Sequence, residues 1–237
     1  MKEKHKYHIA DVVNIILFYC VFICLAVSII IGIVHFAEGN LHISRLIYRF
    51  VLTALMCVPY IIKKAFKITF SRVVSSVYYG YMYLSGFLGV VLEFYRTYVW
   101  WDMFIHFLMG AILAVLSIYI LNLTIYKKNT SKHNLFITFL FMLLFAMGIS
   151  AMWEIVEFVG DLIFDLGFQR YITYEGVTLI GKEALFDTMI DLTMDFLGAV
   201  VGIIFTFVMI KINKRFLKTF NIKKLRSAEQ EVEDIEE

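Results

Sequence analysis

The sequence has very little charge and almost no proline. Only 18% of its 237 residues are charged and Pro59 is the single proline, whereas 61% are hydrophobic and the mean hydropathy is +0.79. A soluble domain of this size carries roughly 25% charged and about 45–50% apolar residues. One globular core could not bury this much apolar surface, so the composition excludes a nucleic-acid-binding protein and predicts a polytopic membrane protein.

Cysteine is also scarce. The three cysteines, Cys20, Cys24 and Cys57, lie inside apolar runs. Structural disulfides belong to loops that face an oxidising compartment, so the sequence excludes a secreted disulfide scaffold. A removable signal peptide is not expected either, because the first apolar run is too long and follows three lysines.

Long apolar runs, in contrast, are abundant. Six are about 20 residues long, which is the length that crosses roughly 30 Å of hydrocarbon as a helix. Only helices and closed barrels satisfy the backbone in lipid, and runs without two-residue alternation exclude the barrel. We predict an all-α bundle of six transmembrane helices: Val12–Phe36, Leu46–Ile62, Val73–Leu92, Met103–Ile125, Leu135–Val159 and Thr188–Ile210.

The basic residues indicate the orientation of this bundle. Most of the 22 lysines and arginines fall in four segments that alternate along the predicted topology, namely Lys2–Lys6, Lys63–Arg72, Lys127–Lys132 and Lys211–Arg226. Both termini are therefore expected in the cytoplasm (N-in/C-in). The predicted parts are a cytoplasmic N-terminus (1–11), a transmembrane domain (12–210) and a basic-then-acidic tail (211–237), whose basic half could contact anionic lipid headgroups.

The longest predicted outward connection runs from Gly160 to Phe186. It contains Gly167, Gly176 and Gly181 among apolar residues. It could fold over the outer end of the bundle as a lid, lie at the interface as a helix, or form an irregular loop, and the sequence leaves these alternatives open.

Ionisable residues gather at the outer ends of four predicted helices, where the default expectation is that they are functional or paired. At about 100° per residue, Asp187, Asp191 and Asp195 share a face with Gly198 and Gly202, which favours close helix packing below the acids. We predict a pocket that opens outward, walled by the last four helices and floored by glycine. Its ionisable residues are Glu93, Arg96, Asp102, His106, Glu154, Glu157, Asp161, Asp187, Asp191 and Asp195.

Charge limits what such a pocket can contain. Eight acids face only Arg96, with His106 taken as neutral. Isolated buried carboxylates are costly and become neutralised. The pocket must therefore hold protons, a metal cation or a cationic ligand.

A divalent metal ion is our preferred hypothesis, because one imidazole among carboxylates suits Mg²⁺, Mn²⁺ or Zn²⁺. Turn-spaced acids on each helix can direct two ligand atoms at one place. The predicted metal ligands are His106, Glu154, Glu157, Asp161, Asp191 and Asp195. Asp102 and Asp187 are the predicted catalytic residues, and Arg96 and Glu93 the predicted substrate-binding residues.

Three functions remain open at this point. A metal-dependent enzyme would act on a lipid-linked or headgroup substrate at the outer leaflet. A cation or proton-coupled transporter would use the same acids as its binding site, and a structural or partner-binding protein would use them as a buried polar network. Glu93 and Arg96, three residues apart, could simply form a salt bridge.

Motifs in the second half of the chain resemble a known family. Trp100-Trp101-Asp102 with His106, Trp153-Glu154 with Glu157, and Asp187-Thr188-Met189 with Asp191 are similar to the YjdF-like bacterial inner-membrane proteins. The VanZ-like membrane proteins, linked to glycopeptide tolerance, show a more distant similarity. The resemblance covers about residues 90–202 and implies a bacterial inner-membrane location, but it supplies no reaction. The YjdF-like pattern often has asparagine at the position of Asp195.

Overall fold

The regular structure is almost entirely helical, as predicted. The exceptions are two-residue strands, β1 (Ile68–Thr69) and β2 (Lys223–Lys224), which pair antiparallel with Ile68 opposite Lys224. The computed structural model describes residues 9–39, 47, 49–51, 54–124, 135–164, 166–173, 177–213, 216 and 223–224. The predicted cytoplasmic segment up to residue 8, the connection 125–134 and most of the tail from 214 onward lie outside this part of the chain.

Three helices are long and apolar enough to cross a membrane among the residues described. They are α6 (Trp100–Thr124), α7 (Leu135–Phe164) and α8 (Lys182–Ile212), with candidate spans at Trp100–Ile118, Leu135–Phe164 and Lys182–Ile212. They overlap the last three predicted spans, because each contains a long apolar stretch with few charged residues. The chain is therefore a membrane protein.

The boundaries of the last two helices differ from the prediction. Helix α7 continues past Val159 to Phe164, and α8 begins at Lys182 rather than Thr188. Asp161 and Asp187 thus lie on helices. Their polar side chains suggest a loop in the sequence, but in the structure they point into the helix bundle. The described residues of the connection, 166–173 and 177–181, form no helix, and an antiparallel bridge joins Ile172 to Thr178.

The second predicted span, Leu46–Ile62, is not one continuous helix. Within its described residues the chain turns at Met56–Cys57, and α3 (Val58–Phe66) begins immediately afterwards with Pro59 in its first turn. Proline is tolerated there because the first-turn N–H groups have no intrahelical acceptor. Helix α3 has only nine residues, too few to cross a bilayer.

The other two predicted spans are helical. Helix α1 (Ile9–Ala37) contains Val12–Phe36, whereas Val73–Leu92 is formed by α4 (Arg72–Met82) and the π-helix η1 (Tyr83–Val91). The bond from Leu92 N–H to Phe87 O, 2.9 Å long, closes the wider five-residue turn of η1. Glu93 then adopts a left-handed conformation, and the chain continues into the short helix α5 (Phe94–Thr97).

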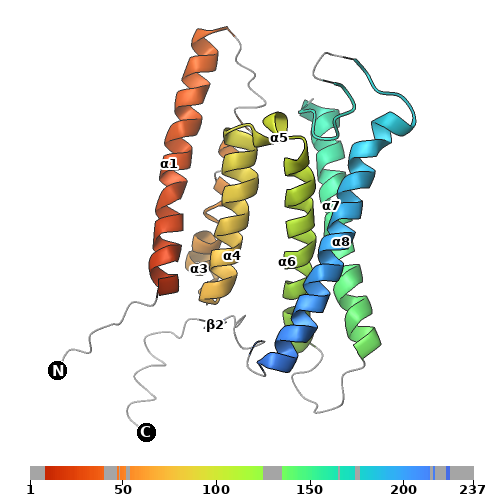
Figure 1. The fold of residues 1–237 in the computed structure, drawn as a ribbon. Coiled ribbons are helices and arrows are strands. Elements are labelled where there is room, and N and C mark those ends of the chain that lie inside the picture. The colour runs from red at the N-terminus through yellow and green to blue at the C-terminus, as the bar shows by residue number, and fades with distance from the viewer. Residues whose placement is uncertain are drawn as a thin grey trace, which may run out of the picture.

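The helices form two groups that stand side by side (Figure 1). Helix α1 packs on α4 and η1, whereas α6, α7 and α8 pack on one another. The closest approach is between α6 and α8. A Cβ added at Gly198 would clash with the carbonyl oxygen of Phe107, and one added at Gly110 would clash with the carbonyl oxygen of Asp195. The prediction that glycines permit close packing below the acids is confirmed.

The α6–α8 bundle has two chemically different halves. The apolar half is the cluster of buried side chains Ala114, Ile118, Leu121, Met142, Ala146, Ala199 and Ile203. The polar half lies toward α5 and the α7–α8 loop, and its buried side chains are His106, Glu154, Asp191 and Asp195, with Asp102 and Asp187 only partly exposed. Glycine contacts between the two halves bring α8 against α6 at the depth of the acids.

Candidate metal centre

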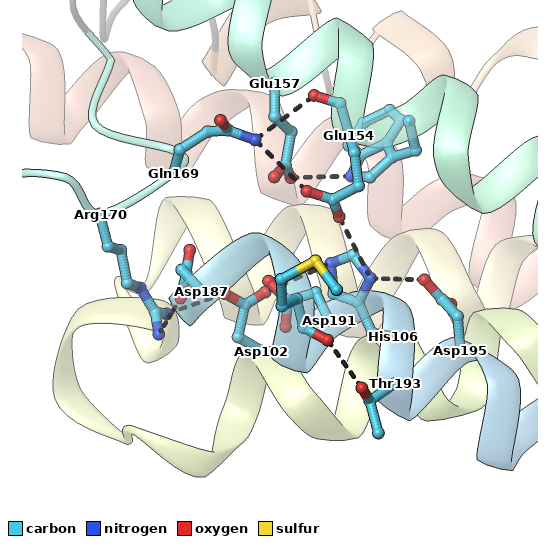
Figure 2. Close-up of polar contacts among 12 residues, drawn as sticks. Asp102, His106, Glu154, Glu157, Gln169, Arg170, Asp187, Asp191, Thr193 and Asp195 are labelled. Carbon is cyan, nitrogen blue, oxygen red and sulfur yellow. Dashed lines mark hydrogen bonds and ion pairs between the residues drawn. The ribbon is translucent and has the colours of Figure 1, made fainter. Parts of the chain in front are cut away.

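His106 lies at the centre of the polar half (Figure 2). Its Nδ1 atom is 2.9 Å from Oδ2 of Asp195, and both side chains are fully buried or nearly so. An ionised carboxylate can only accept a hydrogen bond. We therefore assign the proton to Nδ1, which leaves the lone pair of Nε2 free to bind a cation.

Two carboxylates face Nε2 from opposite helices. Asp102 Oδ1, one turn earlier on α6, lies 3.7 Å away, and Asp191 Oδ2 on α8 lies 3.9 Å away. These distances are too long for hydrogen bonds. Two atoms that each lie about 2.0–2.2 Å from one metal ion are roughly 3–4 Å apart. Asp102, His106 and Asp191 offer ligand atoms that all lie within 4.8 Å of one another, so they form a group that could hold a metal ion.

Helix α7 contributes two glutamates to the same region. Glu154 places Oε1 3.9 Å from Nδ1 of His106, and its Oε2 accepts a hydrogen bond from the side chain of Gln169 at 3.3 Å. Glu157 accepts a 2.8 Å hydrogen bond from the indole N–H of Trp153, one turn earlier. The two glutamates therefore differ in their partners, although they lie on one face of α7.

The α7–α8 loop supplies the basic partner of the site. Arg170 places one guanidinium nitrogen 3.0 Å from Asp102 Oδ2 and the other 3.4 Å from Asp187 Oδ1. It also donates to the carbonyl of Tyr95 at 3.3 Å. The backbone of Arg170 has a φ of +45°, a conformation uncommon for residues with a side chain. The contacts of its guanidinium group hold the backbone in this conformation.

Asp161 holds the loop in register. Its two carboxylate oxygens accept the backbone N–H groups of Phe168 and Gln169, both at 2.8 Å. Both oxygens of this predicted metal ligand therefore contact the loop backbone, and each keeps a further lone pair.

Glu93 and Arg96 belong to a separate ion-pair group beside α5. Glu93 pairs with Arg49 at 2.8 Å and more loosely with Arg96 at 3.8 Å. Arg49 is buried, whereas the Arg96 side chain is 62% exposed. The salt bridge expected from their spacing is present, with Arg49 as an additional partner.

The polar half leaves carboxylate oxygens unpaired. Six acids are opposed by Arg170 in the contacts described, and several of their buried oxygens accept no hydrogen bond: Glu154 Oε1, Asp187 Oδ2, Asp191 Oδ1 and Asp195 Oδ1. Buried polar atoms are normally paired. This arrangement can therefore accept positive charge, whether as a metal ion or as protons.

Four partners were not identified from the sequence: Arg49, Trp153, Gln169 and Arg170. The role of Arg170 as a partner of the acids could have been predicted, because Arg170 and Lys182 are the two basic residues in the connection from 160 to 186, which acidic residues flank on both sides. Gln169 had none, since a loop glutamine follows no periodic pattern.

Comparison with known proteins gives one result. A family model described as "Predicted membrane protein (DUF2238)" matches residues 16–212. No curated protein and no solved structure matches the chain. The YjdF-like resemblance is consistent with this family, although no named relative confirms it.

Proposed function

The chain belongs to this DUF2238 family of predicted membrane proteins, and we propose that it is a metal-dependent membrane enzyme acting on a lipid-linked or headgroup substrate. One observation carries the proposal. The free nitrogen of a buried histidine faces two aspartates from different helices, at 3.7 and 3.9 Å, while a third carboxylate fixes the other nitrogen at 2.9 Å. Histidine ligands of metals usually have such a carboxylate partner.

The ligands in this proposal are Asp102, His106 Nε2 and Asp191. Asp195 is assigned a different role from the one its spacing suggested, because it orients the imidazole instead of binding this ion. One nitrogen and two carboxylate oxygens suit Zn²⁺ or Mn²⁺, and also Mg²⁺ with added waters.

The proposed chemistry is hydrolysis or group transfer by an activated water. A bound divalent ion lowers the pKa of its water toward neutrality. We assign Asp187 as the base, and the support is that Arg170 holds its Oδ1 while its buried Oδ2 is unpaired. Arg96, supported by Glu93, is exposed beside α5 and is proposed to contact a headgroup phosphate.

The proposed topology places the metal centre at the extracytoplasmic side of a bacterial inner membrane, with both termini in the cytoplasm. Six crossings, the second interrupted near Met56–Cys57, would alternate correctly. In support, the beginning of α1 and the end of α8 lie at the same end of the bundle, opposite α5 (Figure 1).

Transport and purely structural roles have weaker support. A transport path would continue through the apolar half, but among the described residues Ala114, Met142, Ala146 and Ala199 are completely buried there. The buried hydroxyls of Ser117 and Thr206 are bonded to carbonyls of their own helices. A network that only joined helices would be expected to pair its own oxygens, whereas the polar half leaves four of them unpaired.

Metal analysis of the detergent-purified protein tests the proposal. Wild type should retain a divalent ion after gel filtration, and His106→Ala should lose it. Glu183→Gln, which removes an exposed acid in the first turn of α8, is the matched control and should behave as wild type. A wild-type protein that binds no divalent ion from any of Mg²⁺, Mn²⁺ or Zn²⁺ would contradict the proposal.

A second experiment addresses the reaction. Wild type in vesicles of phosphatidylglycerol and phosphatidylethanolamine, supplied with Mn²⁺, should release water-soluble headgroups detectable by mass spectrometry. Asp187→Asn should abolish release while retaining the metal. Equal release by wild type and Asp187→Asn would remove Asp187 from the proposed chemistry.

A further inference from the structure

We propose that α3 is an interfacial helix that binds the anionic headgroups of the surrounding phospholipids. The inference concerns the end of the bundle opposite the proposed metal centre, and it does not depend on the proposed reaction. It is argued from the two faces of the helix, from the exposure of its side chains, from its place in the fold and from its charge.

Helix α3 has one basic face and one apolar face. At about 100° per residue, Lys63 and Lys64 lie on one side of the helix with Tyr60 between them. Lys67 follows directly, in the left-handed conformation that ends the helix. The residues on the opposite side are apolar: Ile61, Ile62, Ala65 and Phe66. Separate basic and apolar faces are typical of helices that lie at a membrane surface.

Neither face of α3 is buried against the rest of the bundle. None of its nine residues, all of which the structure describes, is buried. Ile61 and Phe66 are 52% and 65% exposed, and Lys63 and Lys64 are exposed as well. Apolar surface of this kind is unfavourable in water. At a membrane surface, acyl chains would cover the apolar face while the long lysine side chains reach the headgroups.

The position of α3 in the fold agrees with an interfacial role. The helix is too short to cross a bilayer, and it lies toward the end of the bundle where α1 begins, away from α5 (Figure 1). The pairing of β1 with β2 places Ile68, which follows α3, opposite Lys224 of the tail. The basic half of the tail, which the sequence predicts to contact anionic headgroups, therefore joins the chain directly after the lysines of α3.

The charge of α3 determines which lipid it prefers. Among the residues that the structure describes, no acidic side chain forms an ion pair with Lys63, Lys64 or Lys67. Each lysine near an anionic surface strengthens association roughly fivefold. A zwitterionic lipid such as phosphatidylcholine carries no net charge and offers no such gain, so the expected ligand is an anionic phospholipid such as phosphatidylglycerol.

Lipid binding to the purified full chain tests the inference. In a neutral detergent, native mass spectrometry gives the dissociation constants of phosphatidylglycerol and of phosphatidylcholine with the same acyl chains. Wild type should bind phosphatidylglycerol more tightly. The double variant Lys63→Gln/Lys64→Gln should raise that dissociation constant about tenfold or more and leave phosphatidylcholine binding unchanged. Two controls should behave as wild type: Lys63→Arg/Lys64→Arg, which keeps the charge, and Lys182→Gln, which removes an exposed lysine at the start of α8.

Two results would overturn the inference. Equal binding of the two lipids by wild type would exclude an anionic lipid and would leave an acidic protein segment as the partner of the basic face. Undiminished phosphatidylglycerol binding by Lys63→Gln/Lys64→Gln would place the lipid elsewhere on the chain. If the double variant does not fold, Lys67→Gln alone should still weaken binding about fivefold, and no change would be equally contradictory. Metal retention by wild type, which tests the proposed function, is independent of all these outcomes.

Discussion

The polar and apolar halves of the α6–α8 bundle use the same three helices but treat their buried polar atoms in opposite ways. In and below the apolar half, Ser117 and Thr206 donate to carbonyls of their own helices, at 2.7 and 2.8 Å. In the polar half, Asp191 and Asp195 each keep one buried oxygen without a partner. The apolar half is therefore arranged for stability, and the polar half holds groups that a structural role alone does not require.

The largest effect is expected from placing a carboxylate in the apolar half. Ile203 is 1% exposed within that cluster, and Ile203→Asp would bury a charge without a cation. The free energy of unfolding should fall by more than about 3 kcal/mol. Ile203→Val, the matched control, should cost about 0.5–1.5 kcal/mol. Thermal unfolding in detergent is the measurement. An equal loss of unfolding free energy in the two variants would show that the apolar half tolerates a buried carboxylate as the polar half does.

Separating α6 from α8 should have the next largest effect. The new Cβ of Gly198→Ala would clash with the Phe107 carbonyl, and helix displacement should cost about 2–3 kcal/mol. Gly148→Ala is the control, because nothing lies within 4 Å of its new Cβ; helix propensity should leave it as stable as wild type or slightly more stable. A lower unfolding temperature for Gly148→Ala than for Gly198→Ala would contradict the close packing of α6 on α8.

Asp191→Asn sharpens the comparison, because it should weaken metal binding without weakening the fold. Loss of a proposed ligand should lower Mn²⁺ affinity by more than about tenfold. In the presence of a chelator the unfolding temperature should equal or exceed that of wild type, because a buried negative charge among other acids is removed. A variant that is less stable in chelator but binds Mn²⁺ normally would assign Asp191 to the structure rather than to the metal.

The smallest effect is expected at the edge of the polar half. Trp153→Phe removes the indole N–H that Glu157 accepts at 2.8 Å, which should cost about 1–2 kcal/mol. Trp100→Phe, at an exposed ring on α6, should stay within about 0.5 kcal/mol of wild type. The two variants are compared by thermal unfolding. A larger loss of stability in Trp100→Phe than in Trp153→Phe would show that the Trp153–Glu157 hydrogen bond does not stabilise the fold.

Sequence patterns predicted the membrane-spanning helices better than their ends. The apolar runs of α6, α7 and α8 exceed the length needed to cross a bilayer, and each run has one interpretation. The start of α8 was misplaced because Glu183 and Asp187 resemble loop residues, although Asp187 is held by Arg170 within the bundle. The break at Met56–Cys57 was missed because the residues on both sides of Pro59 are apolar, so that the apolar run continues through it. In the structure Pro59 lies in the first turn of a new helix, α3.

The position of the acids on one helix face was predictable, but the partner of each acid was not. Helical spacing brought Asp191 and Asp195 to one face, four residues apart, and both do meet His106. Spacing cannot tell which ring nitrogen each carboxylate faces, because this depends on how closely α8 approaches α6. The contributions of Gln169 and Arg170 depend on the path of a loop, for which no periodicity exists.

The distance along the chain between His106 and Asp195 bears on how the protein is made. The two residues form a buried hydrogen bond across a separation of 89 residues. During synthesis, α6 leaves the ribosome long before α8 exists, so its imidazole waits without the carboxylate that orients it. The apolar surfaces of α6 and α7 can associate in the meantime, whereas the proposed metal centre can be completed only when the last helix has entered the membrane. Chains truncated before α8 would therefore retain two of the three long helices and would lack Asp191 and Asp195, the two α8 carboxylates that face His106.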